Sequence, residues 1–440
     1  MSDDPRPKKN SSVRHTRAIQ RDRSKQELHG PPGEDVQKLL EEIVSPITYS
    51  QIASYRAMGL RQRILNLPVM MAFVLSLIWR HVGSVTDAIR ELNQRGILWA
   101  SPTIVSQQAV SERLRSFPPE LFRRVLLDVL PQMQERWAER KRPLSAVMQW
   151  ATQRYSKVLI LDGSTLDALL RKVGLLREGE GTVLAGRMGA LLNAASMLAE
   201  ELWYEEDSHA HDQTFWEKAV AKLPKGVLLL FDLGFVNYGW FDYLTDKAMF
   251  FVTRCKTNAF TQVEQVLQTS AQFHDQIVWL GSPQKRCKHL MRLVEIEHKG
   301  RWYRYLTNVL DPAELPAAYV AQLYQQRWRI EDAFNVAKRQ LGLAYFWVGS
   351  INGVQVQVWA TWILYLVLVD LTDCIADAMN RPFEDISMEM VFKGLYHFSE
   401  EKKLGRASDP VAFLVKEAKL LGILKHRNHP KLPLTPVLNA

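Results

Sequence analysis

The stretch "KVLILDGSTLD" at residues 157–167 decides the fold class of this chain. Its apolar run predicts a short strand buried on both faces, and Asp162 ends that run. "GVLLLFDLGF" at residues 226–235 has the same pattern, an apolar run followed at once by Asp232. Open α/β folds gather functional groups at the carboxyl ends of buried strands, so the two aspartates are candidate site residues.

The segments around these two stretches complete an α/β pattern. "GRMGALLNAASML" and "EELWYEE" predict a pair of strands, "DQTFWEKAVAKL" and "YGWFDYLTDK" predict helices, and "MFFVTRC" predicts a further strand. The order β-β-β-α-β-α-β is that of an RNase H-like domain, whose first part we expect over residues 150–256. Residues 257–312 then carry "IVWLG", "HLMRLVEIEH" and "RWYRYLTNVL", the last two facing each other across "HKG" as in a hairpin. We therefore predict a β-rich insertion there, and a helix over 313–349 that completes the domain.

The regions on either side of this domain are predicted to be helical. Residues 1–33 are polar and basic and predict a disordered arm, residues 34–145 are helical, and 350–440 are helical with a basic tail. Residues 84–116 have the pattern of a helix-turn-helix, with Gln107, Gln108 and Arg115 as candidate DNA contacts. An ordinary helical hairpin explains the same pattern equally well.

Charge and cysteine content narrow the class of protein. The formal net charge of +9 favours a polyanionic partner, although +4 of it lies in residues 1–30. The 3 cysteines are too few for a disulfide framework and too far apart for a zinc knuckle, which fits a reducing cytoplasm. The longest apolar runs, 67–79 and 358–369, fall short of the roughly 20 residues that span a bilayer, so we expect buried helices and no membrane association.

The stretch "LYQQRWRIEDAFNVAKRQLGL" at 323–343 predicts one long helix with a lone glutamate among cations. On a helical wheel, Tyr324, Arg327, Glu331 and Lys338 fall within roughly 60° of one another, beside an apolar stripe. Glu331 therefore lies at the edge of the buried face, where it can meet the two aspartates.

Three carboxylates without a suitably placed Cys or paired His form an all-oxygen site, which suits Mg²⁺ or its substitute Mn²⁺. Two such ions can activate a nucleophile and stabilise a leaving oxygen in phosphoryl transfer. Arg327 and Lys338 would then bind flanking phosphates, and Tyr324 could donate a hydrogen bond to one.

The spacing Tyr-x2-Arg-x3-Glu-x6-Lys resembles the YREK signature of IS4-type DDE transposases, and "DGST" and "DLGF" resemble the first and second aspartate motifs of that family. The resemblance runs over roughly residues 155–345. It implies that Asp162, Asp232 and Glu331 are the catalytic metal ligands, with two ions per site. Tyr324, Arg327 and Lys338 are then expected on transposon-end DNA. Leu233 departs from the pattern, because many relatives have Arg there.

The resemblance further implies nicking at the terminal inverted repeats and joining of the new 3′-OH to target DNA by a bacterial protein that acts as a homodimer. A DNA hairpin is the expected intermediate, with a flipped base held against an aromatic side chain. Trp302, Trp279 and Trp328 are candidates for that contact, and packing within the protein is the alternative for each. Arg254 and Lys256 are candidate DNA contacts or simple surface charges.

Two other functions fit the same residues: an RNase H-fold nuclease that cuts without strand transfer, and a catalytically silent DNA-binding protein. The complete triad speaks against the second.

Overall fold

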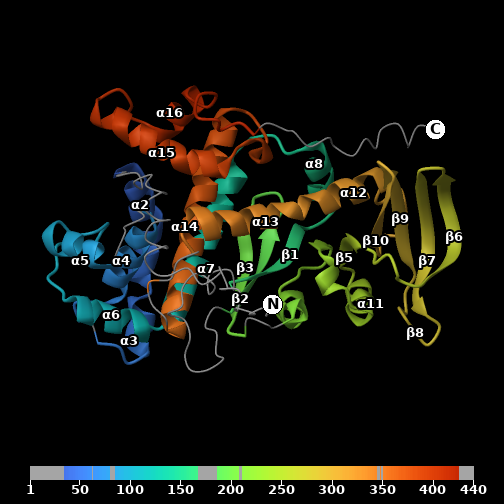
Figure 1. Ribbon diagram of the computed structural model, residues 1–440, viewed down its shortest axis with the longest axis horizontal. Coiled ribbons are helices and arrows are strands. Elements are labelled where there is room, and N and C mark those ends of the chain that lie inside the picture. Colours follow the sequence, from blue (N-terminus) through green and yellow to red (C-terminus); the bar gives the residue numbers. More distant parts are fainter. Residues whose placement is uncertain are drawn as a thin grey trace, which may run out of the picture.

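The computed structural model describes residues 34–61, 63–79, 85–166, 186–207, 211–343, 347 and 350–425. The predicted basic arm over 1–33 and the end of the basic tail beyond residue 425 lie outside the described residues. Figure 1 shows helices gathered on the left, a strand-rich part on the right, and a helical segment that crosses the strands.

The first half of the sheet has RNase H-like topology. Its strands stand in the order β3-β2-β1-β4-β5, where β2 is antiparallel to its neighbours and β1, β4 and β5 are parallel. The predicted strand pair is therefore present as the β2–β3 hairpin, and the two apolar stretches are β1 and β4. The bounds are β1 (Val158–Thr165), β2 (Arg187–Asn193), β3 (Ala199–Glu205), β4 (Leu228–Phe231) and β5 (Phe250–Arg254).

The β-rich insertion continues this sheet instead of forming a separate one. Strand β10 pairs antiparallel with β5, and the order continues β10-β9-β7-β6 to the far edge, with β8 paired to β7. The β9–β10 hairpin across "HKG" is confirmed, whereas β6 was not predicted, because its polar, exposed residues lack an apolar face. The bounds are β6 (Thr261–Ser270), β7 (Phe273–Ser282), β8 (Lys285–Arg286), β9 (Met291–His298) and β10 (Arg301–Thr307).

Two hydrophobic clusters cover the two faces of the sheet. Alternate residues of β1 and β4, such as Ile160 and Leu230, belong to the larger cluster, which includes α12 (Ala317–Gln326) and α13 (Trp328–Asn335). Their neighbours, such as Leu161 and Phe231, belong to the smaller cluster around α10 (Trp216–Val220) and α11 (Tyr238–Asp246). The amphipathic helix predicted over 212–223 is shorter than expected, a 3₁₀ turn η1 (Asp212–Phe215) followed by α10.

The N-terminal helices pack against the C-terminal ones. The long α14 (Ile351–Ala378) contacts α4 (Leu67–Trp79), α6 (Gln107–Ser116) and α7 (Pro119–Glu139). The apolar run at 358–369 is thus part of a 28-residue helix, longer than expected from the sequence. By length and composition α14 could cross a membrane, and it is the one such helix among the described residues, but 94% of its most apolar window is buried inside the protein. That burial is typical of a core helix.

The remaining elements complete the helical regions. They are α2 (Glu34–Ser50), α3 (Ile52–Ala57), α5 (Val85–Gln94), α8 (Ala146–Thr152), η4 (Phe383–Asp385), α15 (Met388–Lys403) and α16 (Pro410–Lys416). Helix α6 begins after the N-cap Ser106, whose hydroxyl accepts from the backbone N–H of Ala109. Residues 95–106 separate α5 from α6, a longer connection than the 3–4-residue turn of a compact helix-turn-helix.

The helix predicted over 323–343 is interrupted in two places. Helices α12 and α13 meet at Arg327, where the backbone N–H groups of Arg327 and Ile330 bond three residues back, to Tyr324 and Arg327. After Asn335 the chain widens into a π-helical segment, η3 (Val336–Gln340). A π-helical turn within an α-helix is frequently found at a functional site.

Candidate functional site

The ends of adjacent strands align the two aspartates. Leu161 pairs with Phe231 across β1 and β4, so the next residues along the strands, Asp162 and Asp232, fall side by side. Neighbouring strands lie about 4.8 Å apart. The alternation of the two clusters places both side chains on the face that α12 and α13 cover.

Arg254 extends the same row onto the next strand. Leu230 pairs with Val252 across β4 and β5, and this register places Arg254 level with Asp232. Tyr305 of β10 is in turn the partner of Arg254. Four adjacent strands thus contribute two acids, a cation and a tyrosine to one row across the sheet.

Helices α12 and α13 close the site from above. The Tyr324 hydroxyl donates to Asp232 Oδ1 at 3.1 Å. Burial first, and then the charge of Asp232, raise the pKa of Tyr324, so its phenol stays a hydrogen-bond donor at neutral pH. Tyr324 also packs against Tyr305, with ring centroids 5.5 Å apart.

Arg327 lies between the first and third carboxylates. It donates to Asp162 Oδ2 at 3.1 Å and to Glu331 Oε1 at 2.8 Å, and only 4% of the residue is exposed. Burial opposes its charge, but Tyr324, Asp162 and Asp232 outweigh burial and raise the pKa of the guanidinium. The site therefore holds Arg327 as a charged internal partner of its acids in this structure.

Lys338 approaches the site from η3. Its ammonium donates to the Ser164 hydroxyl, two residues beyond Asp162 on β1. The sequence did not single out Ser164, although it stands within the quoted "DGST". Tyr324 and Arg327 thus contact the two aspartates, Lys338 contacts Ser164, and Glu331 is linked to the group through Arg327.

The aromatic candidates differ in position. Trp328 is 57% exposed and the Arg327 guanidinium carbon lies 4.8 Å from its ring centroid, beside the carboxylates. Trp302 points to the opposite face of the sheet, where it stacks on His274 with ring centroids 4.7 Å apart. Trp279 donates from Nε1 to Glu264 at 3.0 Å and lies toward the other end of its strand. Trp302 therefore faces away from the carboxylates. Trp279 alternates with Val278 and Leu280 of the smaller cluster, so it shares the carboxylates' face but lies four residues along β7 from Asp275, the β7 residue in register with their row.

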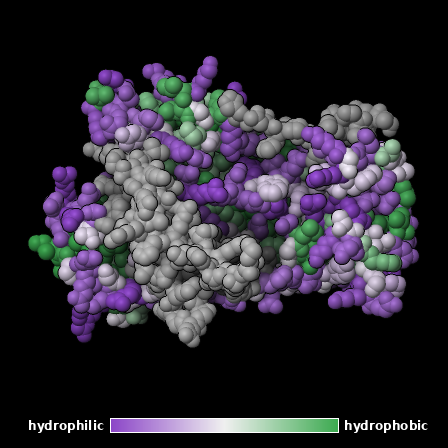
Figure 2. Space-filling model, viewed as in Figure 1, coloured by the Kyte–Doolittle hydropathy of each residue, from purple (hydrophilic) through white to green (hydrophobic). Residues whose placement is uncertain are grey.

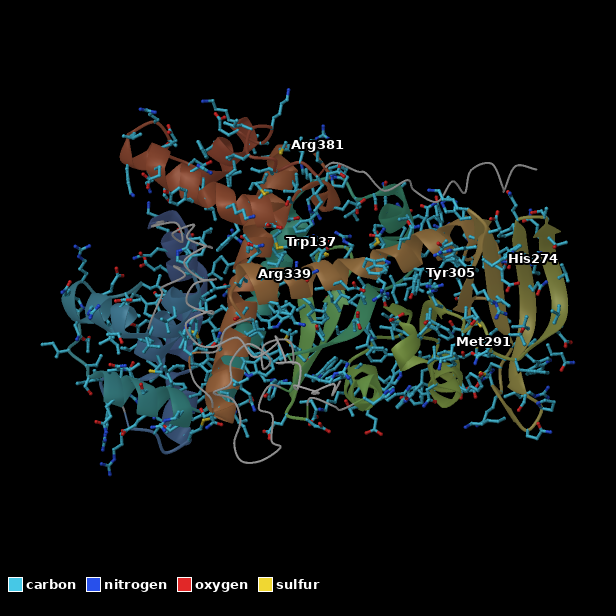
Figure 3. All side chains as sticks on the ribbon, in the orientation of Figure 1. Trp137, His274, Met291, Tyr305, Arg339 and Arg381 are labelled. Carbon is cyan, nitrogen blue, oxygen red and sulfur yellow. The ribbon has the colours of Figure 1, made fainter. Side chains whose placement is uncertain are left out.

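Tyr303, and not its neighbour Trp302, lies on the carboxylate face of the sheet. It alternates with Trp302 along β10 and shares the face of Tyr305. The Arg254 guanidinium carbon lies 5.7 Å from the Tyr303 ring centroid, and Arg254 Nε has no hydrogen-bond partner among the described residues. Figure 3 shows Tyr305 beside α12, and His274 nearer the free edge of the sheet. Lys256 is exposed just beyond β5.

Gln107, Gln108 and Arg115 lie on α6, in the helical region and apart from the strand row. All three are exposed. Gln108 donates to Glu112 at 3.0 Å along its own helix. Figure 2 shows hydrophilic side chains spread over the strand-rich part on the right, with only small hydrophobic patches between them.

The donor set of the site fits a hard divalent cation, because its three acids offer only oxygen. Within the described ranges, however, no three His, Cys, Asp or Glu residues stand close enough to hold an ion as they are arranged. In this arrangement Arg327 and Tyr324 donate to oxygens of all three acids.

Known proteins resemble the chain over this domain. Residues 191–367 match the family model described as the transposase DDE domain, a segment that includes Asp232 and Glu331 and begins after Asp162. A putative transposase, y4zB, from Sinorhizobium fredii (strain NBRC 101917 / NGR234) is 28% identical over 155 residues, which is 33% of this chain and 43% of that protein. A probable transposase for insertion sequence element IS5377 from Geobacillus stearothermophilus is 27% identical over 201 residues, 44% of this chain and 51% of that protein.

The chain thus spans about half the length, or less, of these two relatives. Among solved structures, the cryo-EM structure of a piggyBac transposase synaptic complex with hairpin DNA aligns with 90% of this chain and 86% of its own chain. That alignment has 12% sequence identity and a TM-score of 0.36.

Proposed function

We propose that the chain is a DDE transposase, the transposase of a bacterial insertion sequence, on the basis of its match to the transposase DDE domain over residues 191–367. It cleaves DNA at the ends of its element and joins the freed 3′-OH to target DNA. The observation that supports the proposal is that two neighbouring helical residues bond all three acids: Arg327 donates to Asp162 and Glu331, and Tyr324 donates to Asp232.

The three carboxylates are proposed as the ligands of two divalent ions, Mg²⁺ or Mn²⁺. Bound there, such ions supply Lewis-acid activation of the attacking oxygen and charge stabilisation of the leaving one. The protein's part is to hold the acids on rigid strand ends and on a packed helix. Ile330 and Phe334, both buried in the larger cluster, fix the rotation of α13 and with it the direction of Glu331.

The cations of the site are proposed to hold the DNA backbone. Arg254 offers an unpartnered Nε on the same row as Asp232, and Lys338 offers its ammonium beside Ser164. An arginine fork suits a phosphate because it can donate two parallel hydrogen bonds. Lys256, Gln107, Gln108 and Arg115 remain proposed DNA contacts on charge and exposure alone.

Excision through a DNA hairpin and action as a homodimer on terminal inverted repeats belong to the same proposal. A hairpin at the cleaved end needs a base displaced from its stack. Tyr303, beside Arg254, and Trp328, beside Arg327, are better placed than Trp302 to receive it.

The experiment that tests the proposal incubates the protein with duplexes that carry the element's ends, in the presence of Mg²⁺, and maps the products. Glu331→Gln should reduce cleavage to below about 1% of the wild-type rate while the affinity for the ends changes little, since it removes a ligand charge. Asp332→Asn is the matched control, because Asp332 is the next residue on the helix, is exposed, and forms an ion pair with Lys425 at 3.7 Å.

Retained cleavage by Glu331→Gln contradicts the assignment of the triad. Cleavage without any joined product, from a pre-cut end with a free 3′-OH, favours a nuclease that lacks strand transfer. End binding without cleavage in the wild type favours a silent DNA-binding protein.

A further inference from the structure

Arg327 occupies the position that a metal ligand set would need to leave open. Its two terminal nitrogens bind one oxygen of Asp162 and one of Glu331, at 3.1 and 2.8 Å. These two acids lie on different elements, β1 and α13. The guanidinium therefore ties the strand end to the catalytic helix in the protein without ions.

Such a bridge has an electrostatic reason. Three carboxylates that share one site repel one another, and a buried cation between them removes part of that repulsion. The Asp162 side chain is 15% exposed and that of Arg327 only 5%, so bulk water screens the pair poorly. A planar fork can serve two acids at once, which a lysine cannot do with the same geometry.

The surroundings of Arg327 also provide an alternative position for its side chain. Its Nε has no hydrogen-bond partner among the residues that the structure describes, and its guanidinium carbon lies 4.8 Å from the half-exposed Trp328 ring. The backbone at Arg327 is the junction of α12 and α13, where the regular helical bonding pattern is interrupted. A small change at this junction would redirect the side chain toward Trp328 and solvent.

We propose that Arg327 is an exchangeable counterion, which holds Asp162 and Glu331 together in the DNA-free protein and leaves them when a divalent ion and a DNA phosphate bind. The proposal rests on the proposed function, since it takes the triad as the ion site. Its consequence is linkage: a phosphate that attracts Arg327 strengthens ion binding, and by reciprocity the ion strengthens DNA binding. The free protein then binds ions weakly and becomes loaded on its substrate.

Mn²⁺ binding to the DNA-free protein tests this directly, by electron paramagnetic resonance of free Mn²⁺ and by calorimetry. Arg327→Gln should bind Mn²⁺ at least about tenfold more tightly than the wild type, because one cation beside two ligand oxygens is removed. Arg327→Lys, which keeps the charge without the fork, should fall between the two. Arg339→Gln is the control: Arg339 is exposed on η3, so the same loss of charge should leave Mn²⁺ affinity within about twofold.

Stability and DNA linkage give two further readouts. Without ions, Arg327→Gln should unfold at a lower temperature than the wild type, and Mn²⁺ should restore it, because the ion replaces the lost counterion. Adding an end duplex with a 5′-phosphate should tighten Mn²⁺ binding to the wild type and tighten it less in Arg327→Gln.

Two results separate the failure of this inference from failure of the proposed function. If Asp162→Asn lowers Mn²⁺ affinity while Arg327→Gln and Arg327→Lys bind no more tightly than the wild type, the site stands and the counterion proposal is overturned. If Mn²⁺ binding is insensitive to Asp162→Asn and Glu331→Gln alike, the carboxylates are not an ion site, and both proposals fall.

Discussion

A buried ion pair within the insertion also bonds the segment before α12, and its removal should cost stability. Arg292 of β9 is 0% exposed, and its Nε and a terminal nitrogen donate to the two Asp275 oxygens at 2.8 and 2.6 Å. Its other terminal nitrogen donates to the backbone oxygen of Leu315 at 2.6 Å, two residues before α12 begins. Arg292 thus fastens the start of the helix that carries Tyr324.

The size of the effect follows from what Arg292→Met leaves behind. Asp275 is 3% exposed and would lose its cation, and the Leu315 carbonyl would lose its donor. Breaking a buried pair in this way costs about 3–5 kcal/mol. The double variant with Asp275→Leu should recover most of it, because apolar replacement of both partners is often near neutral.

Urea unfolding followed by circular dichroism measures these differences, with Arg301→Met as control, since Arg301 is exposed on the neighbouring strand. A single variant within about 1 kcal/mol of the wild type would refute the reasoning, given the penalty expected for an unpaired buried charge. A double variant as unstable as the single one would refute it as well. End cleavage by the folded double variant then shows whether the lost link to Leu315 also misplaces Tyr324.

Two further predictions concern the aromatic side chains and the response to alkali. Tyr303→Ala should weaken hairpin formation or cleavage by about tenfold, because base stacking contributes about 1–3 kcal/mol. Trp302→Ala should change both by less than about twofold, because, of these two residues, only Tyr303 faces the site. Equal effects of the two variants in a product-mapping assay would contradict this placement. Burial raises the pKa of Tyr305 from 10.0 to about 12, so the folded state keeps its proton longer than the unfolded chain. Its contribution to stability is therefore complete below pH 10 and is lost as the pH rises toward 12, and a urea midpoint that stays constant from pH 9 to 12 would be inconsistent with it.

The sequence predicted the fold where local pattern and burial agree. The apolar runs of β1 and β4 are buried on both faces of the sheet, which is why they read as continuous hydrophobic stretches that end in acids. The β9–β10 hairpin was predictable from its turn and its alternating residues. Strand β6 was not, because at the edge of the sheet it has no apolar face to bury. Strand propensity and hydrophobic periodicity both reflect burial, so an exposed strand is difficult to predict from either.

The site was predictable as a set of residues but not as a set of contacts. The wheel brought Tyr324, Arg327, Glu331 and Lys338 to one face, yet it could not say that Arg327 turns inward to the acids instead of outward to a phosphate. That choice depends on Asp162, which is 165 residues away in the sequence. Nor could periodicity show the junction at Arg327 or the π-helical segment, because both keep the chain close to a helical path.

Strand register, and not composition, determines which face of the sheet the aromatic side chains of β10 occupy. Trp302 and Tyr303 are adjacent on one strand, so they must face opposite sides of the sheet, and either one could face the acids. The pairing of Thr307 with Val252, and of Tyr305 with Arg254, settles the choice, because it fixes β10 against a strand whose own faces are set by burial. Tyr303 then falls on the side of Tyr305 and the carboxylates. The pairing of the insertion with β5 therefore sets which of its aromatic side chains lies on the same face of the sheet as the three carboxylates.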